Sequence, residues 1–154
     1  MGKIIGVISD THGLLRESVR KKLTPCELII HAGDIGGPHI LRDLREIAKV
    51  IAVKGNVDKD YTGGHLNLAE FIETDGHNIY VIHNIDLLDI DSATAKLDAV
   101  LYGHAHLPSI TYRDGILFLN PGSAGPRRFR HPVSMAYIRI VEGKLVPEII
   151  TLAE

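Results

Sequence analysis

The sequence predicts an α/β protein built from two mixed β-sheets that pack face to face, with helices on the outside. Its first third alternates strand-like apolar runs with segments of helical spacing, and such βαβ units imply a parallel sheet. Its remainder holds mainly strand-like runs, several of them joined by short turns that favour hairpins. No linker divides the chain, so we expect a single domain of residues 1–154.

The first third is expected to form three strands separated by two helices. The strands are predicted over Lys3–Ser9, Glu27–His31 and Lys49–Val53. The helices are predicted over Leu14–Leu23 and Pro38–Ala48. Units of this kind cross over right-handedly and carry their functional sites beyond the carboxyl ends of the strands.

The rest of the chain is expected to be richer in strands. The predicted strands are Ala69–Glu73, His77–His83, Ala99–Gly103, Ile110–Tyr112, Ile116–Leu119, Met135–Val141 and Lys144–Thr151. Short turns that contain Asp-Gly or Glu-Gly separate the pairs that we expect to form hairpins. A short helix is predicted over Ser92–Leu97, with Asp91 as its N-cap.

The composition is that of an ordinary globular protein, with 45% hydrophobic and 23% charged residues in a chain of 154. The net charge of −2 provides no basic surface, so we do not expect binding of long nucleic acid. The single cysteine, Cys26, cannot form an intramolecular disulfide, which suits a reducing compartment. No apolar run approaches the ~20 residues that span a bilayer, and no signal peptide is recognised. We therefore expect a cytoplasmic protein that does not bind membranes.

Polar side chains follow five of the apolar, strand-like runs at the point where each run ends. They are Asp10 with His12, Asp34, Asn56, His83, and His104 with His106. A buried strand that ends in a polar side chain delivers that side chain to one edge of a sheet. Several such strands converge their hard ligands on one place, so the pattern predicts a metalloenzyme with a two-metal site that cleaves phosphate esters.

Each cluster taken alone also has a structural explanation. Asp10 and His12 could belong to an Asx turn, and Asp34 could cap the helix that follows it. Asn56 after a glycine is typical of a turn, and a lone histidine at a strand end, such as His83, is more often structural. The pair of imidazoles two residues apart has fewer structural uses. All five clusters together favour the metal site, because the structural explanation requires five unrelated polar clusters to follow strands by coincidence.

These motifs resemble those of the calcineurin-like metallophosphoesterases, in particular the small bacterial and archaeal phosphodiesterases without a cap domain. The segments that match, in order along the chain, are GVISDTHG, HAGD, VKGN, YGHAH and NPGS. The resemblance covers essentially the whole chain. It implies a four-layer αββα sandwich that binds two divalent metals, commonly Mn²⁺, with Fe, Zn²⁺ or Ni²⁺ as substitutes. A ligand set of carboxylate, amide and imidazole is compatible with all of them.

The resemblance also implies a role for each ligand. Asp10, His12 and His106 would hold the first metal, Asn56, His83 and His104 the second, and Asp34 would bridge both. The implied reaction is hydrolysis of a small phosphodiester, by in-line attack of a hydroxide that bridges the two metals. Asp34, Asn56 and His83 would then be catalytic, and Asn56 would also contact the substrate. No covalent enzyme intermediate is required.

Two positions depart from the family pattern. Many members carry a histidine after the asparagine ligand, usually taken to protonate the leaving oxygen or to hold the phosphate, where this chain has Val57. Asp58 is the nearest candidate for that acid, and we expect it to be exposed and ionised. Glycine is common after the histidine ligand of the second metal, where this chain has Asn84. We expect Asn84 to keep the turn, because asparagine tolerates the left-handed backbone.

Three arginines follow the NPGS segment. We expect Arg127 to clamp the substrate phosphate, because guanidinium matches phosphate bidentately. Arg128 and Arg130 are expected to be solvated, and His31 is expected to support the ligands from the opposite side of its strand end.

Two alternatives use the same fold. One is a phosphomonoesterase, which differs only in pocket shape and in contacts to the non-bridging oxygens. The other is a protein-binding module without catalysis, like a similar subunit of the eukaryotic retromer, which has an impaired site. The presence of all seven expected ligands favours catalysis, and the resemblance is compatible with a homo-oligomer.

Overall fold

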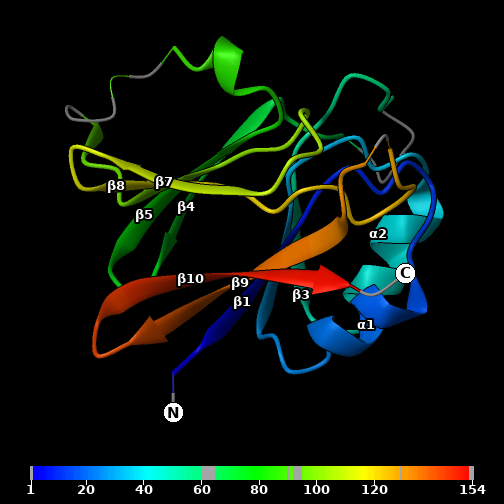
Figure 1. Ribbon diagram of the computed structural model, residues 1–154. Coiled ribbons are helices and arrows are strands. Elements are labelled where there is room, and N and C mark those ends of the chain that lie inside the picture. Colours follow the sequence, from blue (N-terminus) through cyan, green and yellow to red (C-terminus); the bar gives the residue numbers. More distant parts are fainter. Residues whose placement is uncertain (1, 60–64, 90, 92–94, 129, 153–154) are drawn as a thin grey trace.

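The structure is a computed structural model that describes residues 2–59, 65–89, 91, 95–128 and 130–152. Two five-stranded sheets face each other, and helices α1 (Glu17–Leu23) and α2 (Pro38–Arg45) lie on the outer side of the first sheet (Figure 1). The prediction of two mixed sheets with helices outside is confirmed.

The first sheet has the strand order β10-β9-β1-β2-β3. Strands β1 (Ile4–Ile8), β2 (Leu28–His31) and β3 (Lys49–Ala52) are parallel, as the βαβ pattern requires. The C-terminal hairpin of β9 (Val133–Val141) and β10 (Lys144–Leu152) runs antiparallel beside β1. The sheet therefore combines the two ends of the chain.

The second sheet has the strand order β4-β5-β6-β8-β7. Its parallel centre consists of β5 (His77–Ile82), β6 (Ala99–Leu101) and β8 (Ile116–Asn120). Strands β4 (Ala69–Thr74) and β7 (Ser109–Arg113) form its antiparallel edges.

The strand boundaries agree with the predicted ones to within two residues, whereas both helices are shorter. Helix α1 begins at Glu17 instead of Leu14, because the preceding residues form a turn in which Leu14 N donates to Thr11 O at 2.9 Å. Helix α2 ends at Arg45 instead of Ala48. Half of the helix predicted over Ser92–Leu97, residues 92–94, lies outside the described residues. A short 3₁₀ helix, η2 (Ile85–Leu87), was not expected.

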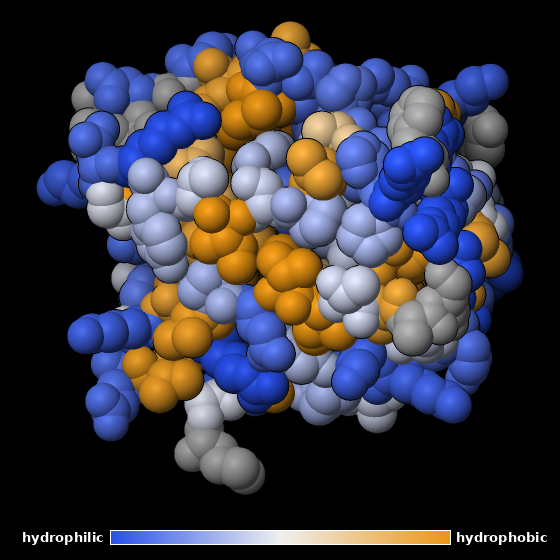
Figure 2. All heavy atoms as spheres, in the orientation of Figure 1, coloured by the Kyte–Doolittle hydropathy of each residue, from blue (hydrophilic) through white to orange (hydrophobic). Residues whose placement is uncertain are grey.

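The hydrophobic core has one layer between the sheets and one under the helices, and a smaller cluster on the second sheet includes Val100 and Phe118. The inner layer includes Ile5 and Val7 of β1 and Val81 of β5, all without exposed surface. The outer layer packs α1 and α2 on the other face of the first sheet through residues such as Leu23 and Leu41. Full burial of each such side chain contributes roughly 1.5–3 kcal/mol. Figure 2 shows apolar side chains in the middle of one face, with hydrophilic ones around its margin.

The parallel strands of both sheets place their carboxyl ends at the same edge of the sandwich. Backbone hydrogen bonds join the loops there, as between Gly103 N and His83 O at 2.9 Å in the second sheet. The loops after β1, β2, β3, β5 and β6 carry the predicted polar clusters. The fold thus brings together side chains that are far apart in the sequence.

Candidate metal centre

Five of the expected ligands hold a left-handed backbone. The φ angle is 58° at Asp10, 45° at His12, 57° at Asp34, 74° at His104 and 60° at His106. Positive φ is uncommon in residues other than glycine, although Asp, Asn and His adopt it more readily than others. Such strained residues cluster at functional sites, where the surrounding structure holds them.

Backbone hydrogen bonds hold the loop after β1 against the loop after β2. Asp10 N donates to Gly33 O at 2.9 Å, and His12 N donates to Asp34 O at 2.9 Å. The two loops therefore run side by side, and the carboxylate of Asp34 lies beside both ligands of the first loop.

The loop after β6 is attached to the same centre. His104 N donates to the Asp10 Oδ2 atom at 3.2 Å, and Asn120 Nδ2 donates to Gly103 O at 3.1 Å. Ser123 Oγ lies 3.2 Å from the carbonyl oxygen of Asp10. The NPGS segment, which the sequence offered without a role, is thus a support for two ligand loops.

Three imidazoles surround the two buried carboxylates. The Nε2 atom of His106 lies 3.5 Å from Asp10 Oδ1, and that of His12 lies 3.8 Å from Asp10 Oδ1 and 3.6 Å from Asp34 Oδ2. The Nε2 atom of His83 lies 3.2 Å from Asp34 Oδ2 and 4.0 Å from Asp10 Oδ1. Two groups of three, Asp10 with His12 and His106 and Asp10 with Asp34 and His83, have ligand atoms within 4.8 Å of one another.

Four polar atoms of this centre are buried and have no hydrogen-bond partner among the described residues, namely Asp10 Oδ1, His12 Nε2, His83 Nε2 and His106 Nδ1. A buried polar atom without a partner costs about 1–3 kcal/mol. A divalent cation bound between carboxylate and imidazole atoms would satisfy Asp10 Oδ1 and His12 Nε2, and O and N ligands of this kind suit Mn²⁺, Fe and Zn²⁺. The residues present therefore fit a metal.

The charges of the centre shift the pKa values of its members. Burial raises the pKa of Asp34, but the adjacent His83, the Val57 N–H at 3.0 Å and the charge of His12 outweigh it and lower the pKa to about 2. Burial lowers the pKa of His83, but Asp34 and Asp10 outweigh it, and the net shift is upward. Asp34 is therefore ionised at neutral pH and available to a cation.

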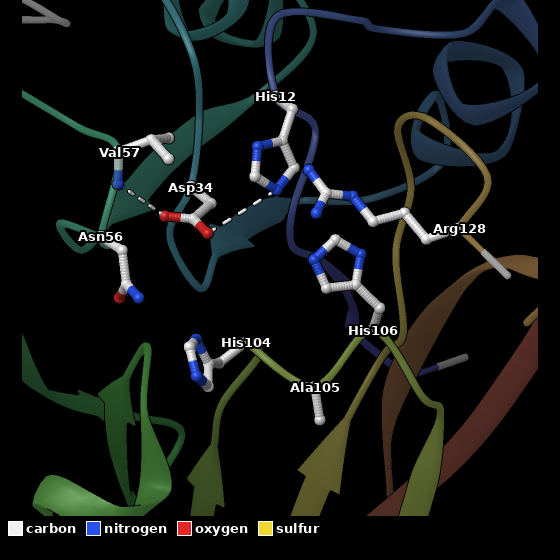
Figure 3. A pocket seen from close by; sticks show the side chains of 8 residues that line it. All are labelled: His12, Asp34, Asn56, Val57, His104, Ala105, His106 and Arg128. Carbon is white, nitrogen blue, oxygen red and sulfur yellow. Dashed lines mark hydrogen bonds and ion pairs between the residues drawn. The ribbon is translucent and has the colours of Figure 1, made fainter.

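The remaining expected ligands, Asn56 and His104, lie at the surface of the same centre. Both are exposed and both line the central pocket. Figure 3 shows the Asn56 amide and the His104 ring pointing into the cavity from opposite loops. The His104 and His83 rings meet edge to face, with centroids 5.3 Å apart.

His31 supports the ligand loops, as its position in the sequence suggested. Its Nδ1 atom accepts a hydrogen bond from Gly33 N at 3.1 Å, so its Nε2 atom, 2.9 Å from Thr11 Oγ1, carries the proton of the neutral ring. Thr11 Oγ1 in turn donates to Ile35 O at 2.8 Å. Burial is the main cause that lowers the pKa of His31 to about 4, so the ring is neutral at pH 7.

The expectation that Asp58 is exposed is wrong. Its side chain is 6% exposed, and its oxygens accept hydrogen bonds from Ile35 N at 2.9 Å, Gly36 N at 3.1 Å and Gly55 N at 2.9 Å. The carboxylate binds the loop after β2 to the loop after β3. Asp58 is not among the residues that line the central pocket.

The expectation for Asn84 is also corrected. Its φ of −109° is extended and not left-handed, and its side chain accepts a hydrogen bond from Asp86 N at 3.0 Å as the cap of η2. Asn84, which stands where glycine is common in the family, is therefore not strained in its backbone. The glycine that matters for His83 is Gly33, with φ 104°, where a Cβ atom would lie 2.7 Å from His83 Nδ1.

The central pocket has a volume of about 340 Å³ and opens over the metal centre (Figure 3). Its lining residues are His12, Asp34, Asn56, Val57, His104, Ala105, His106 and Arg128. Arg128 lines the pocket, whereas Arg127, which is also exposed, is not among its lining residues. The sequence could not decide between neighbours in a loop of unknown conformation.

Comparison with known proteins supports the assignment of the fold and the family. Residues 4–143 match the model of the calcineurin-like phosphoesterase superfamily domain. A probable metallophosphoesterase of Methanocaldococcus jannaschii is 37% identical, over 98% of this chain and 82% of that protein. A phosphodiesterase of the same organism is 28% identical, over 77% of this chain and 82% of that protein.

Among solved structures, vacuolar protein sorting 29 from Cryptosporidium parvum superposes with a TM-score of 0.77. It is 18% identical, and the match covers 99% of each chain, so it shows the shared fold alone. Within the described part of the chain, no helix is long and apolar enough to cross a membrane.

Proposed function

The chain belongs to the calcineurin-like phosphoesterase superfamily, and from this premise we propose that it is a metal-dependent phosphodiesterase acting on a small phosphodiester. The observation that carries the proposal is the convergence of buried carboxylate and imidazole atoms at 3.2–4.0 Å beneath an open pocket. A structural role explains such a cluster poorly, because Asp10 Oδ1 and His12 Nε2 stay buried without a partner in the described structure.

The proposed ligand sets keep those that the resemblance implies. Asp10, His12 and His106, whose ligand atoms lie together, would hold one metal. Asp34, whose ligand atom lies within 4.8 Å of those of Asp10 and His83, would be shared with a second. His83 would hold the second metal with Asn56 and His104, whose side chains point into the same cavity. Mn²⁺ is the proposed ion, with Fe, Zn²⁺ and Ni²⁺ as substitutes.

Two bound divalent metals would supply a low-pKa water and would stabilise charge on the phosphoryl oxygens, which is the chemistry of direct in-line hydrolysis. The protein supplies orientation and the ionised form of Asp34, whose low pKa keeps it charged. Asn56, which lines the pocket, would contact a phosphoryl oxygen. Val57, 51% exposed at the pocket, offers no proton to a leaving group. We therefore propose a preference for esters with good leaving groups.

The wider proposal is a single domain without a cap, cytoplasmic and open to small substrates. The pocket would accept a phosphate ester, and the net charge of −2 does not favour binding of long nucleic acid. A homo-oligomer remains compatible with this proposal.

Two alternatives share the site. A phosphomonoesterase would use the same ligands and prefer esters with a terminal phosphate. A protein-binding module would use the same fold, as the likeness to vacuolar protein sorting 29 illustrates. The intact ligand set favours an enzyme over the module, since binding of a protein partner does not require it.

The test is hydrolysis of bis-p-nitrophenyl phosphate by metal-stripped protein, before and after Mn²⁺ is added. We expect Mn²⁺-dependent turnover that Asp34→Asn and His83→Ala reduce by at least ~100-fold, as loss of a metal ligand does. The matched control is His77→Ala, because His77 begins the strand whose far end leads to His83. Turnover on p-nitrophenyl phosphate in preference to the diester would favour the monoesterase. Metal binding without turnover of either ester would contradict the proposal that the protein is an enzyme.

A further inference from the structure

We propose that Arg128 binds a non-bridging phosphoryl oxygen of the substrate and so makes the pocket selective for phosphate anions. The inference rests on the proposed phosphoesterase function and names a residue outside the sequence motifs that predict the metal ligands. Arg128 is the one arginine among the residues that line the central pocket.

The position of the Arg128 side chain is the first support. Figure 3 shows its guanidinium beside the His12 ring and above the His106 ring, pointing into the cavity on the side away from Asn56. A ligand bound over the metal centre would therefore meet Arg128 on one side and Asn56 on the other. None of the hydrogen bonds and ion pairs among the described residues involves the Arg128 guanidinium.

The loop that carries Arg128 is fixed from both sides. Ala124 N donates to Ser9 O at 3.0 Å, and Arg16 Nε donates to Gly125 O at 3.0 Å. Ser123 Oγ contacts the Asp10 and Pro126 carbonyl oxygens at 3.2 Å each. These contacts hold the loop against the first ligand loop, so Arg128 begins from a defined place at the rim of the pocket.

The charge of Arg128 is the second support. Most other polar residues of the pocket, such as Asp34 and His106, are suited to bind cations. A guanidinium beside that centre gains nothing from a bound cation, because like charges repel. The position of the Arg128 guanidinium becomes electrostatically favourable when an anion lies between the guanidinium and the metals. A tetrahedral phosphoryl group fits this place, since guanidinium presents its N–H donors as a fork to two oxygens.

Arg127 offers a matched control. It is the neighbouring residue in the same loop, carries the same side chain, is exposed and does not line the pocket. A change of net charge or of loop flexibility would affect both positions alike. Only direct contact with the anion distinguishes Arg128→Gln from Arg127→Gln.

The experiment measures anion binding and turnover separately. Calorimetry of inorganic phosphate with the Mn²⁺-loaded protein should show Arg128→Gln about 10-fold weaker than the wild type, as expected for one charge-assisted contact. Arg127→Gln should stay within about twofold of the wild type. In turnover of bis-p-nitrophenyl phosphate, the KM of Arg128→Gln should rise by a similar factor. Arg128→Lys should recover only part of the loss, because lysine keeps the charge and loses the fork.

Equal phosphate affinity in Arg128→Gln and the wild type overturns the proposal, whatever the turnover. So does an equal loss in both glutamine variants. If the wild type binds phosphate through Arg128 but hydrolyses neither ester, the anion site stands and the proposed enzymatic function fails. Thermal unfolding of each variant shows whether the fold is intact, and the exposed position of Arg128 leads us to expect unchanged melting temperatures.

Discussion

The Nδ1 atom of His83 lies 2.8 Å from the carbonyl oxygen of Ala32, so the loop after β5 is joined to the end of β2 across the two sheets. A carbonyl oxygen only accepts, and therefore Nδ1 carries the ring proton. The Nε2 atom is then left with its lone pair toward Asp34, at 3.2 Å. This hydrogen bond fixes the tautomer that a metal requires.

The pH dependence of metal binding follows from this arrangement. The net effect of the environment, in which Asp34 and Asp10 outweigh burial, raises the pKa of His83, so a proton competes with the metal for Nε2. We expect the affinity for Mn²⁺ to fall as the pH is lowered from about 8 to about 6, with protons released on binding. Calorimetry in buffers of different ionisation enthalpy measures both effects. Affinity independent of pH over this range would contradict the assignment.

Gly33 is predicted to be essential for the position of His83. In Gly33→Ala, the new Cβ atom would meet the His83 ring at 2.7 Å, and φ of 104° disfavours alanine. We expect a loss of about 2–4 kcal/mol in the free energy of unfolding, and weaker binding of the second metal. Gly76→Ala separates the two causes, because Gly76 also has positive φ, at 79°, but nothing lies within 4 Å of its Cβ position.

The control variant should lose only about 1 kcal/mol in urea unfolding and keep its metal affinity, since backbone conformation alone changes there. If Gly33→Ala and Gly76→Ala lose the same free energy of unfolding and both keep their metal affinity, the close approach of Gly33 to His83 does not contribute to stability or metal binding. The comparison therefore tests packing at the centre independently of turn strain.

His104 is predicted to lower the stability of the metal-free protein through its left-handed backbone, while its side chain contributes to binding of the second metal. Its φ is 74°, and the side chain is exposed. In the metal-free protein, His104→Gly should be about 1 kcal/mol more stable to urea than His104→Ala, because glycine adopts this conformation without a Cβ clash. Both variants should lose the second metal equally. Equal stability of the two variants would show that the position is not strained.

The strands and the meeting of the polar clusters could be predicted because both depend on local patterns. Apolar runs such as that of β1 end where Asp10 begins its loop, and parallel strands bring such ends to one edge. The environment of Asp58 could not be predicted, because it depends on two loops that fold over it. The same reason applies to Arg128, because its place in the pocket depends on the path of the whole loop and not on the adjacent residues in the sequence.

His31 is predicted to make the protein sensitive to acid. Its pKa is lowered, chiefly by burial, from 6.5 to about 4, so between these values the unfolded chain binds a proton that the native protein does not. The resulting stability is present above pH 6.5 and is lost as the pH falls toward 4, by about 3 kcal/mol in all. Urea unfolding at several pH values measures the slope. His31→Gln, which keeps a donor and an acceptor for Thr11 and Gly33, should reduce that slope, and an unchanged slope would assign it to other groups.

Asp58→Asn distinguishes a supporting carboxylate from an acid that protonates the leaving group. Asp58 accepts from three backbone N–H groups, and an amide in its place turns one acceptor into a donor that faces a donor. We expect about 1–3 kcal/mol lower stability and a turnover that falls by the same factor on aryl and alkyl esters. An acid would act differently, because its loss slows esters with poor leaving groups most. Rates on a series of aryl phosphodiesters of rising leaving-group pKa, compared with the wild type, decide between the two. A drop that steepens with leaving-group pKa would restore Asp58 as the acid, despite its burial.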